Sequence, residues 1–111
     1  MEQPITIAMI LKKQADLQSD MGFPMGYGDE AVKNCCLSIV SEVGEVLQEI
    51  NWKPWRKKKV KVNNWRVLRE LNDILQFWAN AVTAMGYSHD DVKKALEEKW
   101  EINSRRAKAG Y

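Results

Sequence analysis

The sequence predicts an all-α protein, a small bundle of four to five helices. Two observations predict this class: apolar residues recur at helical spacing over long segments, and glycine and proline fall where such segments end. Alternation with period two is confined to the short stretch at residues 60–62. We expect one domain over residues 1–111, with a core completed by oligomerisation, because so small a chain buries a limited share of its surface.

Prolines mark the first two expected helices. The first helix is expected over residues 5–21, and Pro4 can occupy its first turn, where a missing N–H costs nothing. The second helix is expected over residues 30–51. It ends there because Pro54 disfavours the helical conformation for Lys53.

The third expected helix covers residues 65–85. The side chain of Asn63 or Asn64 can cap its start. Gly86 can close it in the left-handed conformation that commonly ends a helix.

The fourth expected helix covers residues 89–109. Ser88 and Asp91 have the spacing of a capping box at its start, and Gly110 can end it.

Composition excludes several classes of protein. The chain has 17 Lys and Arg against 15 Asp and Glu, and a net charge of +2 is too small for a generally basic nucleic-acid binder. No apolar run approaches the roughly 20 residues of a membrane span, and the first residues do not resemble a signal peptide. We therefore expect a cytoplasmic protein with no membrane partner. Cys35 and Cys36 are adjacent, which disfavours a disulfide between them, so we expect buried, reduced thiols.

Two acidic pairs carry the functional signal. Glu42 and Glu45 lie on one face of the second helix, and Glu70 and Asp73 lie at matching positions on the third. If the two helices pack together, one edge of their interface holds all four carboxylates. The residues expected in the core form the adjoining apolar stripes: Cys36, Ile39, Val43, Leu47, Ile50, Leu71, Ile74, Leu75, Trp78 and Val82.

Four clustered carboxylates repel one another unless a cation neutralises them. Ligands that are all oxygens favour Mg²⁺ or Mn²⁺ over zinc. Either pair alone is typical of a solvated helix face, and the matching positions of the two pairs favour the metal site. Gly44, inside the second helix, can mark a close approach, and Glu49 is an auxiliary ligand or an ion-pair partner of a nearby cation.

A cationic and aromatic segment follows the second helix. Five cations fall within residues 53–59, beside Trp52 and Trp55. Such a segment can bind phosphates while a base stacks on an indole, or it can be a loop anchored by its tryptophans with solvated lysines. On the fourth helix, Lys99, Asn103 and Arg106 share one face, which suits phosphate and base contacts or a solvated helix end.

Three separated motifs resemble those of the all-α nucleoside triphosphate pyrophosphohydrolase superfamily, which includes MazG-like enzymes, dCTP pyrophosphatases and dimeric dUTPases. They are the E-x-x-E of Glu42 and Glu45, the E-x-x-D that follows after 24 intervening residues, and the ending K-x-x-x-N-x-x-R-x-x-x-G-Y. The likeness covers about residues 31–111. Nearer the start, Gln14 fits a dUTPase-type Q-x-x-L-N, in which Gln18 stands at the asparagine position.

The resemblance implies a MazG-like fold and hydrolysis of a nucleoside triphosphate to its monophosphate and pyrophosphate. It implies that the four carboxylates hold Mg²⁺, with Mn²⁺ as a possible substitute, and that Glu42 or Glu45 orients or deprotonates the attacking water. No histidine is required, and His89 is expected to be exposed. The implied substrate-binding residues are Gln14, Trp52, Lys53, Trp55, Arg56, Phe77, Lys99, Asn103, Arg106 and Tyr111.

The resemblance makes dUTP the first expected substrate, with dCTP and purine deoxynucleotides as alternatives. It also implies a homodimer or a tetramer made of two dimers, and no nucleic-acid partner. A non-enzymatic alternative stays open, in which the chain is a single-stranded nucleic-acid-binding or assembly module.

Overall fold

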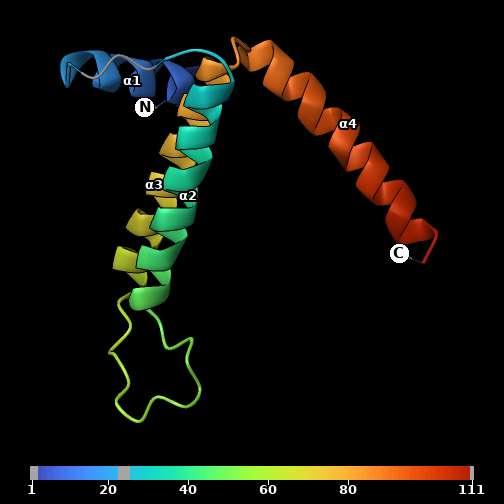
Figure 1. Ribbon diagram of the computed structural model, residues 1–111. Helices are drawn as coiled ribbons and strands as arrows, with labels where there is room; N and C mark the ends of the chain where they lie inside the picture. Colours follow the sequence, from blue (N-terminus) through green and yellow to red (C-terminus); the bar gives the residue numbers. More distant parts are fainter. Residues whose placement is uncertain (1–2, 23–25, 111) are drawn as a thin grey trace.

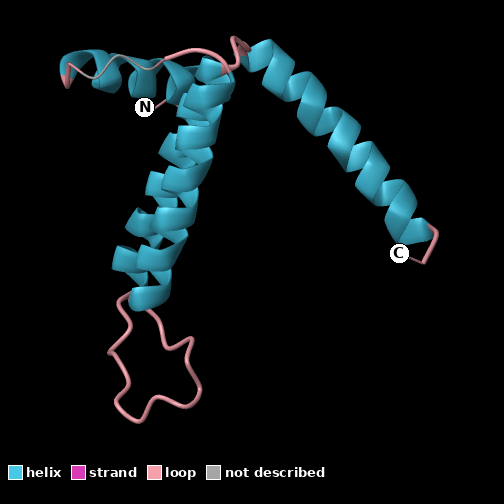
Figure 2. Cartoon of the chain, in the orientation of Figure 1, coloured by secondary structure: helices cyan, strands magenta, loops and turns pink. Residues whose placement is uncertain are grey.

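The computed structural model describes residues 3–22 and 26–110. It consists of four helices: α1 (Ile7–Asp20), α2 (Asp29–Gln48), α3 (Asn64–Ala84) and α4 (His89–Lys108) (Figure 1). These described residues include no strand, and residues 60–62 belong to a loop (Figure 2). The all-α class is confirmed.

Helices α2 and α3 form an antiparallel hairpin, joined at one end by the loop of residues 49–63 (Figure 1). At the other end of the hairpin, α1 lies across it, and α4 leaves the hairpin and extends away (Figure 1). The most extensive contacts between helices join α2 to α3, followed by those of α1 with α3. Contacts of α4 are fewer, so the fourth helix adds little to the core of a single chain.

Two of the predicted helix boundaries were wrong. The side chain of Thr6 caps α1 by accepting a hydrogen bond from the N–H of Met9, so Pro4 precedes the helix and does not lie in its first turn. The second helix ends at Gln48, earlier than the predicted residue 51. The reason is the side chain of Asn51, which accepts from the N–H of Val60 at 2.8 Å and donates to its carbonyl at 3.1 Å, and so fastens the two ends of the loop.

The capping signals of the last two helices are confirmed. Asn63 accepts from the N–H of Arg66 at the start of α3. Ser88 and Asp91 form a capping box at the start of α4, with each side chain bonded to the backbone of the other residue. Gly86 has a φ of 80°, the left-handed conformation that permits the tight turn between these two helices.

The buried core is small and is formed mostly by α3, with Cys35 from α2 and Val92 from α4. Its apolar members are Cys35, Ala79, Ala81, Val82, Ala84 and Val92. Few of them are large, and many large apolar side chains stay exposed, among them Trp65 and Trp100 at 69% and 64%. One chain therefore lacks apolar partners for much of its surface. No helix of the described residues is long and apolar enough to cross a membrane.

The predicted core stripe was wrong in part. Val43, Leu71 and Leu75 are more than 40% exposed. Both cysteines are free, as expected, but only Cys35 is buried, so the expectation of a buried thiol was wrong for Cys36. The helices of the hairpin instead pack through the side that carries the acids, as the burial of Cys35 and part of Glu42 shows. Ile39, Leu47, Ile50, Ile74 and Trp78 are half-buried, and Val82 is buried as predicted.

Gly44 provides the first testable prediction, which concerns stability. A Cβ atom at this position would meet nothing within 4 Å apart from its own helix, so no described part of the chain approaches it. Glycine in a helix interior costs roughly 0.5–1 kcal/mol relative to alanine. We expect Gly44→Ala to raise the free energy of unfolding by about that amount in urea titrations. A loss of stability would show that this side of α2 contacts a further chain.

Candidate metal and nucleotide site

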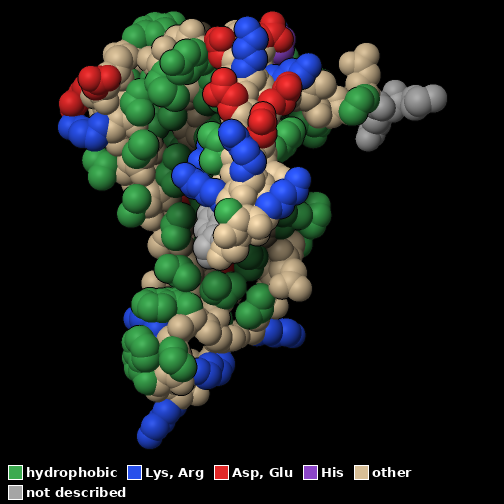
Figure 3. All heavy atoms as spheres, turned by 90° about the vertical axis from the view of Figure 1, so that its right-hand side faces the viewer, with side chains coloured by type: hydrophobic (Ala, Val, Ile, Leu, Met, Phe, Trp, Pro, Cys, Tyr) green, Lys and Arg blue, Asp and Glu red, His purple; other side chains and the backbone are tan. Residues whose placement is uncertain are grey.

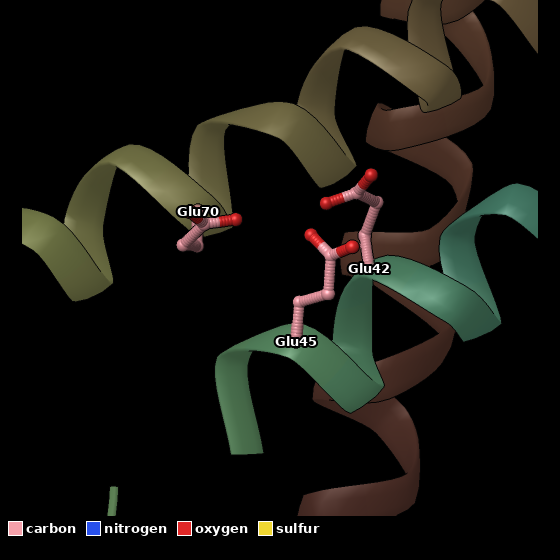
Figure 4. Close-up of side chains that lie close together, drawn as sticks. All are labelled: Glu42, Glu45 and Glu70. Atoms are coloured by element: carbon pink, nitrogen blue, oxygen red, sulfur yellow. The ribbon is translucent and has the colours of Figure 1, made fainter. Parts of the chain in front are cut away.

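Three carboxylates meet between the helices of the hairpin. Glu42 and Glu45 extend from α2 toward Glu70 on α3 (Figure 4). One oxygen of each lies within 4.8 Å of the others. They come from adjacent turns, since Glu42 and Glu45 are separated by three positions and so project from the same face of α2. The predicted meeting of the two acidic motifs is thus present in the geometry.

The side chain of Glu42 is in the least favourable environment. Its Oε2 atom is buried and has no hydrogen-bond partner among the described residues. The pKa of Glu42 is raised, first by burial and then by the charge and hydrogen bond of Glu45, with Asp73 and Glu70 adding further repulsion. A buried acceptor without a partner costs free energy in the folded state. A bound cation would relieve the repulsion and would give the buried oxygen a partner.

Asp73 lies one turn after Glu70 on α3 and is half-buried. Its charge reaches Glu42 and raises the pKa of that carboxyl, which places Asp73 in the same electrostatic cluster. It is not one of the three residues whose oxygens lie within 4.8 Å of one another. We define the carboxylate cluster as Glu42, Glu45, Glu70 and Asp73.

The donor set of the carboxylate cluster fits a hard divalent cation. Oxygens that coordinate one Mg²⁺ at about 2.1 Å lie no more than roughly 4.2 Å apart, close to the spacing seen here. All donors are carboxylate oxygens, which suit Mg²⁺ or Mn²⁺. The unpartnered Oε2 of Glu42 supplies a ligand atom that the protein itself leaves unused.

Glu49 forms an ion pair across the hairpin. Its Oε1 atom lies 3.3 Å from Nε of Arg66, near the start of α3. Of the two roles expected for Glu49, the structure shows the ion pair. Arg66 was not singled out in the sequence, because nothing in a linear chain shows that the start of α3 returns beside the end of α2.

The loop of residues 49–63 forms an ordered cationic and aromatic tip. The rings of Trp52 and Trp55 contact edge to face with centroids 6.0 Å apart. Nζ of Lys53 lies 5.2 Å from the Trp52 ring, and Nζ of Lys59 donates to the Lys53 carbonyl. Lys and Arg side chains lie beside hydrophobic ones at this lower end of the molecule (Figure 3). Trp55 is 71% exposed, so it does not anchor the loop onto the core.

The residues expected to bind substrate do not come together within one chain. Trp52, Lys53 and Arg56 line a cleft of only about 10 Å³ at the loop. Phe77 instead lines a cavity of about 370 Å³ between α1, α2 and α3. Gln14 is buried, at 8% exposure, and is not among the residues that line this cavity. These substrate-binding side chains are therefore separated in the single chain, and their joint site stays a prediction for an assembly of chains.

The cavity beside Phe77, which we call the interhelix cavity, is lined by residues that the sequence reading missed. Asn34 and Ser38 come from α2 and Asn80 from α3. A signal for them existed, because each continues the acidic face of its helix away from the loop. Four residues span about 6 Å along a helix, so Ser38 lies one turn from Glu42, and Phe77 one turn from Asp73. The cavity and the carboxylate cluster are therefore neighbours in the same groove of the hairpin.

The polar residues of α4 lie apart from the carboxylate cluster. Lys99, Asn103 and Arg106 are exposed on a helix that extends away from the hairpin (Figure 1). Lys99 lines a groove of about 450 Å³ between α3 and α4, together with Trp78 and Leu96. Tyr111 lies outside the described residues. His89 is exposed, as expected.

A sequence model of the family described as dUTPase matches residues 6–83 of the chain. A search of curated proteins found no match. The matched region includes α1, α2, all of α3 but its last residue, and every member of the carboxylate cluster. The chain therefore belongs to this dUTPase family and is, in general terms, a dUTPase-like nucleotide pyrophosphohydrolase with an all-α fold.

Proposed function

We propose that the protein is a metal-dependent pyrophosphohydrolase that converts a deoxynucleoside triphosphate, dUTP in the first place, to the monophosphate and pyrophosphate. The observation that carries the proposal is the meeting of Glu42, Glu45 and Glu70 across the hairpin, with one buried oxygen left unpartnered. Family membership supports the same reaction class. The biological role of the protein would be control of the nucleotide pool.

The carboxylate cluster would hold Mg²⁺, or Mn²⁺ in its place. Such an ion neutralises phosphate oxygens and lowers the pKa of bound water, which is the chemistry this reaction needs. Glu42 or Glu45 would orient the attacking water or accept its proton.

Lys and Arg side chains would bind the negatively charged phosphates, and in a single chain these side chains lie apart. Lys53 and Arg56 are at the loop, and Lys99 and Arg106 are on α4. We propose a homodimer, or a tetramer of two dimers, that brings α4 of one chain toward another. The exposed apolar side chains of α3 and α4 support this assembly, because a chain of this size seldom leaves so many uncovered.

A panel of deoxynucleoside triphosphates tests the proposed function. Each is incubated with the protein and Mg²⁺, Mn²⁺ or a chelator, and pyrophosphate is measured. We expect release that requires the metal, with dUTP cleaved fastest, dCTP and purine nucleotides being the alternatives. No release from any nucleotide, combined with salt-sensitive binding to single-stranded DNA, would instead support a nucleic-acid-binding module.

A thermal-shift measurement accompanies this panel. A cation that binds only the folded protein stabilises it, by about 2.7 kcal/mol at a hundredfold excess over its dissociation constant. We therefore expect millimolar Mn²⁺ to raise the melting temperature. An unchanged melting temperature, both with and without a nucleotide, would favour an assembly protein without a metal site.

A further inference from the structure

The interhelix cavity contains a buried carboxamide to which the preceding argument gives no role. Asn80 is 2% exposed and lines the cavity, next to Phe77 on the same helix. Its Oδ1 atom is buried, and none of the described residues donates a hydrogen bond to it. An unpaired buried acceptor destabilises the folded state, so a fold that retains one favours a ligand that supplies the donor.

The chemistry of the cavity indicates what kind of ligand supplies that donor. Phe77 offers an aromatic face, while Asn34, Ser38 and Asn80 offer polar groups around it. Ser38 already donates to the carbonyl of Asn34, within α2. A flat ring that is apolar on its faces and carries hydrogen-bonding groups at its edge matches this lining.

A carboxamide has an acceptor and a donor side by side. The edge of uracil presents the complementary pair, an N–H at N3 beside a carbonyl oxygen at C4. Cytosine presents the reverse pair, an acceptor at N3 beside an amino group. Oδ1 is the unpaired atom of Asn80, and it has the acceptor chemistry that N3–H of uracil requires.

We propose that Asn80 is a specificity-determining residue that reads the N3 and C4 edge of uracil in the interhelix cavity. The proposal rests on the proposed function, because a nucleotide whose base occupies this cavity has its phosphates toward the carboxylate cluster, one helical turn away. It also assigns the choice between uracil and cytosine to a residue of α3, outside the loop and outside the predicted substrate-binding residues.

The first test changes the hydrogen-bonding pattern of this side chain. Asn80→Asp keeps the shape but has only acceptors when ionised, so it cannot donate to O4 of uracil, yet it still accepts from the amino group of cytosine. We expect the ratio of kcat/KM for dUTP over dCTP to fall at least about tenfold, since a site that pairs a polar edge discriminates strongly. The matched control is Asn72→Asp, an exposed position of α3, which should leave the ratio unchanged.

A folded Asn80→Asp protein with an unchanged ratio would overturn the proposal. Because a buried carboxylate can prevent folding, Asn80→Ala is measured as well. It removes both hydrogen bonds and should lower kcat/KM more for dUTP than for dCTP. Equal losses for the two substrates would also overturn the proposal.

A measurement on the unmodified protein does not depend on any variant. The side-chain ¹⁵N amide signals of Asn80 should shift during titration with dUMP and stay in place with dCMP at equal concentration. Signals that remain unmoved when dUMP saturates the protein would overturn the role of Asn80. If no nucleotide releases pyrophosphate, the proposed function fails, and the dUMP titration still decides whether Asn80 reads a base.

Discussion

Glu45→Gln is expected to reduce the rate of pyrophosphate release at least about a thousandfold while the fold persists. The carboxylate of Glu45 has an oxygen within 4.8 Å of oxygens of Glu42 and Glu70. The substitution replaces this carboxylate by a neutral amide of the same shape. The loss of metal-based charge stabilisation amounts to several kcal/mol, and each 1.36 kcal/mol or so corresponds to about a tenfold change in rate. Steady-state kinetics with dUTP and Mg²⁺ measures the effect.

Glu101→Gln is the matched control for this variant. Glu101 is an exposed acid of α4, so the same loss of charge there should leave the rate within a small factor of the unmodified protein. Full activity in Glu45→Gln would remove the carboxylate cluster from the mechanism. Equal losses in both variants would show a general effect of net charge.

Glu42→Gln is expected to have opposite effects on stability and on activity. Without metal, the variant should be more stable than the unmodified protein, by about 0.5–2 kcal/mol, because substitutions that relieve unfavourable charges commonly stabilise by that much. The physical reason is the repulsion of Glu42 by Glu45, Asp73 and Glu70, together with its burial. Activity should be lost, and so should the rise in melting temperature on adding Mn²⁺.

The stability gain depends on pH in a defined direction. The folded-state pKa of Glu42 is raised above its ordinary value of 4.5, so the folded protein binds this proton more tightly than the unfolded chain does. The penalty is therefore full once pH exceeds the folded-state pKa, and it disappears as pH falls through that pKa toward 4.5. Urea titrations with a chelator should show the advantage of Glu42→Gln shrinking as the pH falls from neutral toward the ordinary carboxyl pKa of 4.5. A metal-free Glu42→Gln that is less stable at neutral pH would contradict this account.

Local signals in the sequence were sufficient for most of the fold. Asn63, Ser88 with Asp91, and Gly86 act within one turn of where they stand, so helix starts and ends could be predicted from them. The end of α2 could not, because it depends on Asn51 reaching Val60 across the loop. Periodicity also misplaced part of the core, since it shows which face is apolar but not which face another helix covers.

The carboxylate cluster could be predicted because two helices repeat one spacing. Placing Glu42 and Glu45 opposite Glu70 requires only that α2 and α3 pack as a hairpin. The cavity lined by Asn80 could not be anticipated, since it is enclosed by three helices whose relative positions are set by packing. The cations of α4 show the remaining limit, because in the proposed oligomer their place in a site would depend on contacts between chains.

Crystals grown with Mn²⁺ and a non-hydrolysable dUTP analogue test the central claim most directly, because anomalous scattering locates the metal without assumptions about mechanism. We predict an anomalous peak among the oxygens of Glu42, Glu45, Glu70 and Asp73. A carboxylate cluster without anomalous density, in crystals whose nucleotide is clearly bound elsewhere, would contradict it.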